Sequence, residues 1–416
     1  MRVVMRYGKT GLPLDLPDDW AVDVIAKKPM PVMADVDAAL ADMPLGDEAA
    51  GSRTACILIC DITRPVPNRL ILPHLITRLM DSGIAPEHIT VLVATGLHRP
   101  SADDELRELV GDWTLARVKV ANHFARNDDD HVYLGETSRG TPVRLDRRFL
   151  DADLRIVIGL VEPHFMAGYS GGRKLIAPGV AHHGTITSFH RAELLAHPLA
   201  ANCVLEGNPV HEELLEIASM AGNALAVNVV LDDERRLSFV NFGELVRSHS
   251  EAVEFVRPYA EVPVARKYRT VVTSAAGYPL DKTYYQTVKG MVGAMDILAP
   301  GGDLFIVSEC SEGMGSSEYV DAQKRLARLG PEGFLAEIRH KPAASIDEWQ
   351  TQMQVKPMLI GNVHLYSTGL SDADFALTGV QRADDITEAV RAAVRESGDT
   401  RIAVIPEGPY VIPVPH

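Results

Sequence analysis

Short apolar runs that look like buried strands alternate with amphipathic helical patterns along most of this chain. The clearest runs are Ala55–Cys60, Ile89–Ala94, Leu154–Gly159, Leu225–Leu231, Tyr268–Ser274, Gly302–Ser308 and Arg401–Pro406. Continuously apolar strands separated by helices are typical of largely parallel sheets whose two faces are covered. The sequence therefore predicts an α/β fold with largely parallel sheets flanked by helices.

The chain is long enough for two domains, because one hydrophobic core rarely serves 416 residues. Proline and charged residues concentrate around Arg257–Lys267, so we place a boundary there. We predict an N-terminal α/β domain over residues 1–262 and a C-terminal α/β domain over residues 266–392. The proline-rich tail, about 393–416, is expected to return to the first domain. The active site is expected in the cleft between the domains.

Composition and charge restrict the partners of this protein. The formal net charge of −15 argues against nucleic acid or an anionic membrane as a partner. The N-terminus is too short and polar for a signal peptide, and no apolar run approaches the roughly 18 residues of a membrane span. The four cysteines, which contain no CxxC pair, suggest a reducing compartment. We therefore expect a cytoplasmic protein that holds anionic ligands with local cations.

A glycine-rich segment directly follows the apolar run at Leu154–Leu160. It places His164 and Lys174 among three glycines, Gly168, Gly171 and Gly172. Glycines let backbone amides approach a ligand, and the amides at a helix start bind anions. A lysine there is unexpected, because the positive end of a helix disfavours a cation. The adjacent Arg173 favours the neutral, nucleophilic form of the amine. This segment is predicted to be a ligand site.

Polar side chains follow three of the predicted strands. Asp61 and Arg64 follow the first strand, His98 follows the second and His164 follows the third. Ligands of open α/β sheets bind where strands end, so we expect these side chains at one rim. Two histidines with a carboxylate to orient one of them suit acid–base chemistry. Taken singly, either histidine would more often be an ordinary hydrogen-bonded residue.

The second half of the chain adds candidate residues on a predicted helix. Gln286 and Lys289 are three residues apart and therefore share one helix face. Arg64 offers a planar guanidinium that matches a carboxylate bidentately, and Lys289 is a second cation. A solvated helix edge is an equally good interpretation of Gln286 and Lys289 alone, and Trp349 alone is more typical of packing.

Several common motifs are absent from the sequence. No GxGxxG follows a strand, no GxxxxGK[ST] occurs, and neither HExxH nor GxSxG is present. Dinucleotide binding, ATP hydrolysis and serine hydrolysis are therefore unsupported. The histidines His182, His183 and His190 leave a metal site open, although histidine-rich sequence alone is weak support for one.

Taken together, these segments resemble the lactate racemase family that uses a nickel-pincer nucleotide. The matching segments are spread over most of the chain in the family's order: Asp61–Pro65, Gly96–Pro100, Glu162–Lys174, His190 and Tyr285–Lys289. The longest of them is the most specific, and no cofactor-anchoring position departs from the pattern.

The resemblance implies a cofactor and its contacts. Lys174 would hold a pyridinium-derived mononucleotide through a thioamide, and His190 would complete the coordination of Ni(II), which suits imidazole and soft sulfur in a planar set. The N-terminal domain would bind cofactor and substrate. Further cofactor contacts would come from Ser170, Gly171, Gly172, Arg173, Tyr285 and Trp349. Other enzymes would synthesise the nucleotide.

The resemblance also implies inversion of a small anionic 2-hydroxy acid through a transient keto acid. His98 and His164 would each serve one stereoisomer as the base for the hydroxyl proton. Arg64 and Lys289 would bind the carboxylate, Asp61 would orient a histidine or the substrate, and Gln286 would be a secondary contact. The substrate's side chain is not fixed by the sequence.

Two other functions stay open at this point. A metal-dependent hydrolase or lyase would use Asp61, His98, His164 and His190 around zinc or iron, but it leaves Lys174 and its glycines without a role. A non-catalytic hydroxy-acid-binding protein would need the arginine and the lysine but not the paired histidines.

Overall fold

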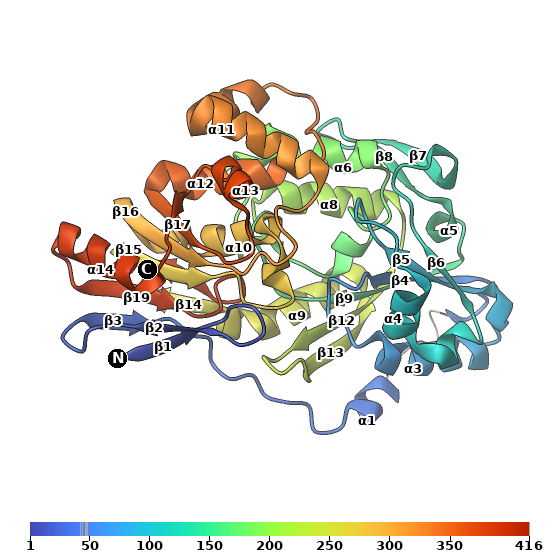
Figure 1. Ribbon diagram of the computed structural model, residues 1–416. Coiled ribbons are helices and arrows are strands. Elements are labelled where there is room, and N and C mark those ends of the chain that lie inside the picture. The colour runs from blue at the N-terminus through green and yellow to red at the C-terminus, as the bar shows by residue number, and fades with distance from the viewer. Residues whose placement is uncertain (42, 44, 46–48, 416) are drawn as a thin grey trace. The chain divides into compact units, whose positions relative to one another are not determined.

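The computed structural model describes residues 1–41, 43, 45 and 49–415, which form two compact units (Figure 1). Unit 1 consists of Met1–Lys28, His190–Cys203 and Pro258–His416, and unit 2 consists of Pro29–Phe189 and Val204–Arg257. Each unit is built around a six-stranded sheet with helices on its faces. The predicted α/β architecture with largely parallel sheets is confirmed.

The sheet of unit 2 has the strand order β13-β12-β9-β4-β5-β6. Its strands are β4 (Ala55–Cys60), β5 (Ile89–Ala94), β6 (Lys119–Asn122), β9 (Leu154–Leu160), β12 (Leu225–Leu231) and β13 (Leu237–Glu244). All neighbouring pairs are parallel except β12 and β13. The central strands are apolar on both faces, because helices cover both, and Ile57, Leu58, Ile156 and Val157 are fully buried.

The helices and short strands of unit 2 surround this sheet. The helices are α1 (Val36–Ala41), α3 (Asn68–Asp81), α4 (Asp103–Leu115), α5 (Arg147–Leu150), α6 (His183–Phe189), α8 (Pro209–Met220) and most of α9 (Leu245–Ala260). Two antiparallel pairs complete the unit, β7 (His131–Glu136) with β8 (Pro142–Asp146) and β10 (Pro163–His164) with β11 (Gly168–Tyr169). As predicted, Asn208 caps α8, and its Oδ1 accepts hydrogen bonds from the amides of Val210 and His211.

The sheet of unit 1 has the order β18-β17-β16-β15-β19-β3 and is parallel throughout. Its strands are β3 (Ala21–Val24), β15 (Tyr268–Ser274), β16 (Leu298–Val307), β17 (Asn362–Tyr366), β18 (Gln381–Arg382) and β19 (Arg401–Ile405). Its helices are α7 (Ala192–Leu195), α10 (Tyr284–Ala294), α11 (Ser317–Ile338), α12 (Glu348–Ile360), α13 (Asp372–Leu377) and α14 (Ile386–Ser397).

Two further strand pairs belong to unit 1, and they explain why the compact units differ from the predicted domains. β1 (Arg2–Met5) pairs with β2 (Leu12–Asp15), and β14 (Glu261–Val264) pairs with β20 (Ile412–Pro415). Strand β3 also pairs with β19. The first 28 residues and the C-terminal tail therefore lie in the unit formed by the second half of the chain. Pairing between segments so distant in sequence leaves no signal in local composition.

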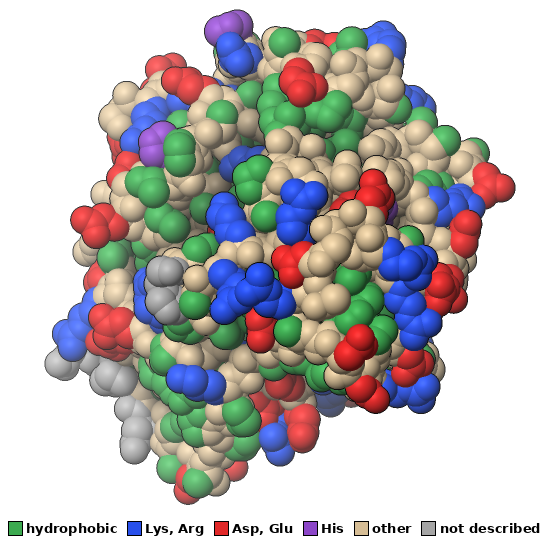
Figure 2. Space-filling model, turned by 90° about the vertical axis from the view of Figure 1, so that its left-hand side faces the viewer, with side chains coloured by type: hydrophobic (Ala, Val, Ile, Leu, Met, Phe, Trp, Pro, Cys, Tyr) green, Lys and Arg blue, Asp and Glu red, His purple; other side chains and the backbone are tan. Residues whose placement is uncertain are grey.

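The surface of the described residues carries charges of both signs. On the face that Figure 2 shows, acidic and basic side chains are interspersed with apolar and neutral ones. Within the described residues, no helix combines the length and the apolar character needed to cross a membrane. The predicted position of the active site in a cleft between domains stays a prediction.

Candidate active site

Three adjacent strands of unit 2 bring their polar loops to one edge of the sheet. Strand β4 lies between β5 and β9 and runs parallel to both. The loops after these strands carry Asp61, His98 and His164. Because the carboxyl ends of parallel strands meet at one edge, residues from three distant segments lie at the same rim.

The carboxylate of Asp61 holds the ring of His98. Nδ1 of His98 and Oδ2 of Asp61 are 2.6 Å apart. The other carboxylate oxygen, Oδ1, accepts hydrogen bonds from the hydroxyl and the amide of Thr63, at 2.5 and 3.1 Å. Burial alone would raise the pKa of Asp61, but the bonds from His98 and Thr63 outweigh it and hold the pKa below its usual value. Asp61 is therefore an ionised acceptor, and His98 carries its proton on Nδ1.

Arg64 has a partner that sequence analysis did not single out. Its guanidinium forms an ion pair with the carboxylate of Glu162, and both side chains are only partly exposed. An anionic ligand would therefore have to compete with Glu162 for this cation. The sequence does contain a signal for this ion pair. Glu162 directly precedes Pro163 and His164, which places an acidic group at the same edge of the sheet as Arg64.

His164 lies in β10, and its Nδ1 acts as an acceptor. The amides of Met166 and Ala167 donate to Nδ1 at 3.3 and 3.2 Å. Strand β10 pairs with β11, which fixes His164 opposite Gly168. The neutral ring then carries its proton on Nε2. His98 and His164 thus have opposite tautomers.

The glycines before Lys174 are required by packing. Gly168 has a φ of +76°, and a Cβ there would lie 2.2 Å from the carbonyl oxygen of Val204. Gly171 has a φ of +81°, and its Cβ would lie 2.7 Å from Cγ2 of Val161. The segment can follow this path only without side chains at these positions.

We expect Gly168→Ala to destabilise the protein strongly. Positive φ costs about 1–2 kcal/mol, and the clash with a backbone carbonyl adds about 1–3 kcal/mol. Gly140 is the matched control, because its φ is +78° but a Cβ added there would have no atom within 4 Å. Chemical denaturation of both variants separates strain from clash. If Gly168→Ala and Gly140→Ala lowered the free energy of unfolding equally, the packing argument would be contradicted.

The backbone donors of this turn are largely used within the protein. The amide of Ser170 donates to the carbonyl of Glu162, that of Gly172 to Oδ1 of Asn228, and that of Lys174 to the carbonyl of Gly171. The turn is a short 3₁₀ helix over Gly172–Leu175. The prediction of an amide cradle for an anion is therefore not supported at these three donors.

Arg173 is buried, and its side chain bonds within the protein, while its predicted contact with a cofactor stays a prediction. Its side chain is 1% exposed, and burial lowers its pKa to about 9. Nη1 lies 2.9 Å from Nε2 of His249, and Nη2 donates to the carbonyl of Ala167 at 2.8 Å. His249 is also buried, on α9, and lies 2.8 Å from the carbonyl of Ser170. Arg173 and His249 thus hold the turn that carries Lys174.

The remaining predicted residues lie in unit 1. Nε1 of Trp349 donates to the hydroxyl of Tyr285 at 3.2 Å, and the ring of His190 stacks on that of Trp349, with centroids 4.4 Å apart and planes at 27°. Helix α10 carries Tyr285, Gln286 and Lys289. Oε1 of Gln286 is buried and has no hydrogen-bond partner among the described residues. The structure thus groups His190 with Trp349 and Tyr285, within one unit.

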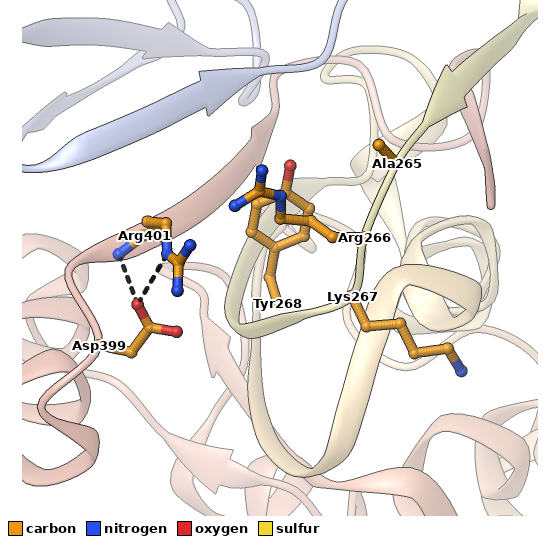
Figure 3. A pocket seen from close by; sticks show the side chains of 6 residues that line it. All are labelled: Ala265, Arg266, Lys267, Tyr268, Asp399 and Arg401. Carbon is orange, nitrogen blue, oxygen red and sulfur yellow. Dashed lines mark hydrogen bonds and ion pairs between the residues drawn. The ribbon is translucent and has the colours of Figure 1, made fainter. Parts of the chain in front are cut away.

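A cavity of 360 Å³ in unit 1 contains none of the predicted site residues (Figure 3). It is lined by Ala265, Arg266, Lys267, Tyr268, Asp399 and Arg401. Arg401 pairs with Asp399, and Figure 3 shows Lys267 directed away from that pair. Within the described ranges, no three or more His, Cys, Asp and Glu side chains are arranged to hold a metal ion. The metal-hydrolase alternative gains no support from the structure.

A buried histidine cluster behind the His98 loop was missed by sequence analysis. Nδ1 of His131 lies 2.7 Å from the carbonyl of Asn127, and its Nε2 lies 3.0 Å from Nε2 of His123. The carbonyl of His123 accepts from the hydroxyl of Thr95, just before the loop. Because His131 donates through Nδ1, its Nε2 accepts from His123, whose own Nδ1 lies 3.3 Å from the hydroxyl oxygen of Thr95.

We expect the cluster to make the protein sensitive to acid. Burial above all, and then the neighbouring His131, Arg148 and His182, lower the pKa of His123 to about 3. Its value in the unfolded chain is about 6.5. As the pH falls, the unfolded chain therefore takes up this proton before the folded protein does. The contribution of His123 to the free energy of unfolding is fully present above pH 6.5 and decreases as the pH is lowered towards 3. At pH 5 the loss is about 2 kcal/mol relative to pH 7.5.

Chemical denaturation at both pH values checks this expectation. His123→Gln should show a pH dependence smaller by that amount, whereas His88→Gln, at an exposed position, should match the wild type. An unchanged pH dependence in His123→Gln would show that another group is responsible.

The fold and the rim of unit 2 define the class of this protein, an α/β enzyme with a histidine–carboxylate pair at the carboxyl ends of parallel strands. Two family descriptions match the chain, the lactate racemase N-terminal domain over residues 7–202 and the lactate racemase C-terminal domain over residues 265–413. The chain belongs to the lactate racemase family, and it is a racemase.

Individual relatives are similar over almost their whole lengths. The lactate racemase of Thermoanaerobacterium thermosaccharolyticum is 30% identical over 424 residues, which cover 99% of this chain and 98% of the relative. The lactate racemase of Lactiplantibacillus plantarum is 32% identical over 382 residues, which cover 89% of this chain and 88% of the relative.

Solved structures show the same architecture. The lactate racemase apoprotein of T. thermosaccharolyticum matches with a TM-score of 0.93 and 30% identity, over 100% of both chains. A protein from Thermotoga maritima matches with a TM-score of 0.68 and 18% identity, over 90% of this chain and 96% of the other, which shows similarity of fold alone.

Proposed function

We propose that this racemase inverts the C2 stereocentre of a 2-hydroxy acid, with a nickel-pincer nucleotide attached to Lys174. The observation that carries the proposal is the Asp61–His98 pair, in which a buried, ionised carboxylate leaves the lone pair of His98 on Nε2. A base of this kind suits removal of a hydroxyl proton. Lactate is the first substrate to test, because the relatives are lactate racemases.

The residues present fit the proposed cofactor and its substrate at three points. Lys174 is held in a fixed turn by backbone bonds and by packing that excludes side chains at the preceding glycines. The imidazole of His190, the proposed nickel ligand, is oriented by stacking on Trp349. The buried Oε1 of Gln286, without a partner among the described residues, is typical of a position completed by a ligand. When bound, the group would accept the C2 hydrogen as hydride and return it.

The chain's own residues would bind the substrate and move its proton. Arg64 and Lys289 supply positive charge for the substrate carboxylate. Glu162, which pairs with Arg64 in the structure, would release it when the carboxylate arrives. His98 would accept the hydroxyl proton on Nε2, and the carboxylate of Asp61 would stabilise the resulting imidazolium. The keto acid needs protection from water, which a closed site would provide.

We also propose a cytoplasmic location and a supply of the nucleotide by separate synthesis enzymes. Cys56, Cys60, Cys203 and Cys310 form no disulfide with one another, and unbridged thiols persist in a reducing compartment. Protein produced without those enzymes would be folded but inactive.

An intact-mass spectrum with nickel analysis tests the proposal. Protein produced beside cofactor-synthesis enzymes should carry a nucleotide-sized added mass that peptide mapping places on Lys174, with about one nickel per chain. It should also racemise a 2-hydroxy acid, lactate first. An unmodified, metal-free chain under these conditions would contradict the proposed cofactor, and the hydrolase and the non-catalytic binding protein would then be the next functions to test.

A further inference from the structure

The proposed nickel ligand, His190, begins a short segment that belongs to a different unit from its neighbours in sequence. Residues His190–Cys203 lie in unit 1, whereas Phe189 before them and Val204 after them lie in unit 2. The segment contains α7, a helix of four residues, which is too short to be stable by itself. Contacts with the rest of unit 1 must therefore fix the position of His190.

One face of helix α12 contacts this segment. Trp349, Gln352 and Lys356 follow one another at intervals of three and four residues, which is the spacing of side chains on one helix face. The first of them, Trp349, stacks its ring on that of His190, with the centroids 4.4 Å apart. Stacking orients the imidazole, whereas the backbone of the segment is held by hydrogen bonds from the other two residues.

Gln352 and Lys356 donate these hydrogen bonds to two separate points of the segment. Nε2 of Gln352 donates to the carbonyl oxygen of Ala192 at 2.9 Å, and Nζ of Lys356 donates to the carbonyl oxygen of Ala200 at 3.2 Å. Gln352 is only 3% exposed, so leaving its amide without a partner would be costly. Ala192 also belongs to the same apolar cluster as Val355 of α12. The segment is thus attached to α12 beyond the histidine itself.

Lys356 is a partly buried cation, which packing alone does not explain. Burial is the main cause that lowers its pKa to about 8, and the nearby carboxyl group of Asp296 offsets part of that effect. At pH 7 the ammonium group is still mostly charged, so its hydrogen bond to the carbonyl of Ala200 is charge-assisted. Burying a charge is unfavourable unless the group is hydrogen-bonded. A lysine at this position therefore points to a role for that bond.

From these contacts we propose that Gln352 and Lys356 are positioning residues for the nickel site. By attaching the segment to α12, they keep His190 in place as a ligand of the metal, and neither residue needs to touch nickel, nucleotide or substrate. This inference rests on the proposed function. Because the nucleotide is proposed to be attached to Lys174, which lies in unit 2, loss of either hydrogen bond should loosen the nickel but leave the covalent adduct in place.

Gln354 of the same helix is a matched control residue. It is buried like Gln352, and its Nε2 also donates to a backbone carbonyl, that of Thr378, at 2.6 Å. Its Oε1 accepts a hydrogen bond from Gln323 at 3.0 Å. These partners lie outside residues His190–Cys203. Gln354 therefore resembles Gln352 in chemistry but holds a different part of unit 1.

Nickel release from the loaded enzyme tests the proposed role. Gln352→Met and Lys356→Met remove the donor but keep an unbranched side chain of similar length. A coloured chelator reports the rate of nickel release, and intact mass reports the adduct at Lys174. We expect each variant to release nickel about 10-fold faster than the wild type, the lower end of the range for groups that orient a metal ligand. The adduct should be retained.

Two comparison variants separate positioning from general stability. Gln354→Met should release nickel at the wild-type rate, even if it lowers the thermal stability as much as Gln352→Met does. Lys356→Arg keeps a charged donor, so it should release nickel more slowly than Lys356→Met. If Gln354→Met releases nickel as fast as Gln352→Met, or if Gln352→Met and Lys356→Met release it at the wild-type rate, the inference fails.

Hydrogen exchange of the cofactor-free protein gives a second readout that needs neither nickel nor activity. In Gln352→Met and Lys356→Met, the amides of residues 191–201 should exchange about 5-fold faster than in the wild type, as for the loss of one hydrogen bond. The amides of unit 2 should be unaffected, which shows that the variants are folded. Unchanged exchange of residues 191–201 would show that the two bonds do not hold the segment and would overturn the inference.

Failure of the inference and failure of the proposed function have different signatures. A wild-type protein that acquires neither adduct nor nickel beside the cofactor-synthesis enzymes would contradict the proposed function. A wild-type enzyme that carries both, and whose nickel is released no faster after either methionine substitution, would contradict only the role of Gln352 and Lys356.

Discussion

Lys174→Ala should abolish racemisation in protein produced beside cofactor-synthesis enzymes. The lysine is the proposed point of covalent attachment, and the side chains of the rim offer proton transfer and binding but no hydride acceptor. The loss should approach the whole enzymatic acceleration, about 10⁶-fold or more. Turnover of either lactate enantiomer, followed with a stereospecific assay, provides the measurement, and intact mass should show no adduct.

Lys119→Ala is the matched control, because Lys119 begins β6 and is exposed. It should keep the adduct, the nickel and full activity. Turnover of Lys174→Ala within a factor of a few of the wild type would mean that the cofactor is held without the covalent bond, or that the chemistry does not need it. Near-equal thermal stability of both variants is required for either conclusion.

Asp61→Asn should have the next largest effect on turnover. An asparagine amide can donate to Nδ1 of His98, which moves the ring proton to Nε2 and removes the base from the side facing the substrate. Loss of an oriented acid–base group lowers kcat by about 10²–10⁴-fold. The adduct at Lys174 should be unaffected, because Lys174 lies on a turn held by Asn228, Arg173 and His249.

Thr63→Val separates the charge of Asp61 from its orientation. It removes the hydroxyl that donates to Oδ1 but keeps the amide donor and the carboxylate. We expect a loss of kcat of about 10-fold or less, consistent with one hydrogen bond of about 1 kcal/mol. A variant Asp61→Asn that turns over as fast as Thr63→Val would show that Asp61 does not set the tautomer of His98.

The parallel sheets and the groups at their edges could be predicted from the sequence. In a sheet covered on both faces, each strand is a continuous apolar run, so the end of the run marks the end of the strand. The runs before Asp61, His98 and His164 are apolar and short, and a parallel sheet brings their ends to one edge. The pairing of Asp61 with His98 follows from that arrangement, whereas the ion pair of Arg64 with Glu162 depends on side-chain directions that spacing does not reveal.

Other features depend on long-range packing and left no local signal. Arg173 resembles a ligand-binding residue in sequence, yet its burial against His249 depends on the position of α9, 76 residues later. The glycines near Lys174 suggested an open cradle. They are instead required by packing, because a side chain at either position would collide with Val204 or Val161. The histidine cluster joins two loops and a hairpin and has no recognisable spacing.

The pairing of β3 with β19 has a consequence for how this protein is made. Ala21 lies opposite Arg401, so one of the first strands to leave the ribosome has its partner among the last. Unit 1 cannot close its sheet during synthesis until nearly the whole chain has emerged, while the strands of unit 2 are already present. A fragment that lacks the first 28 residues would therefore show its defect in the half of the molecule encoded last.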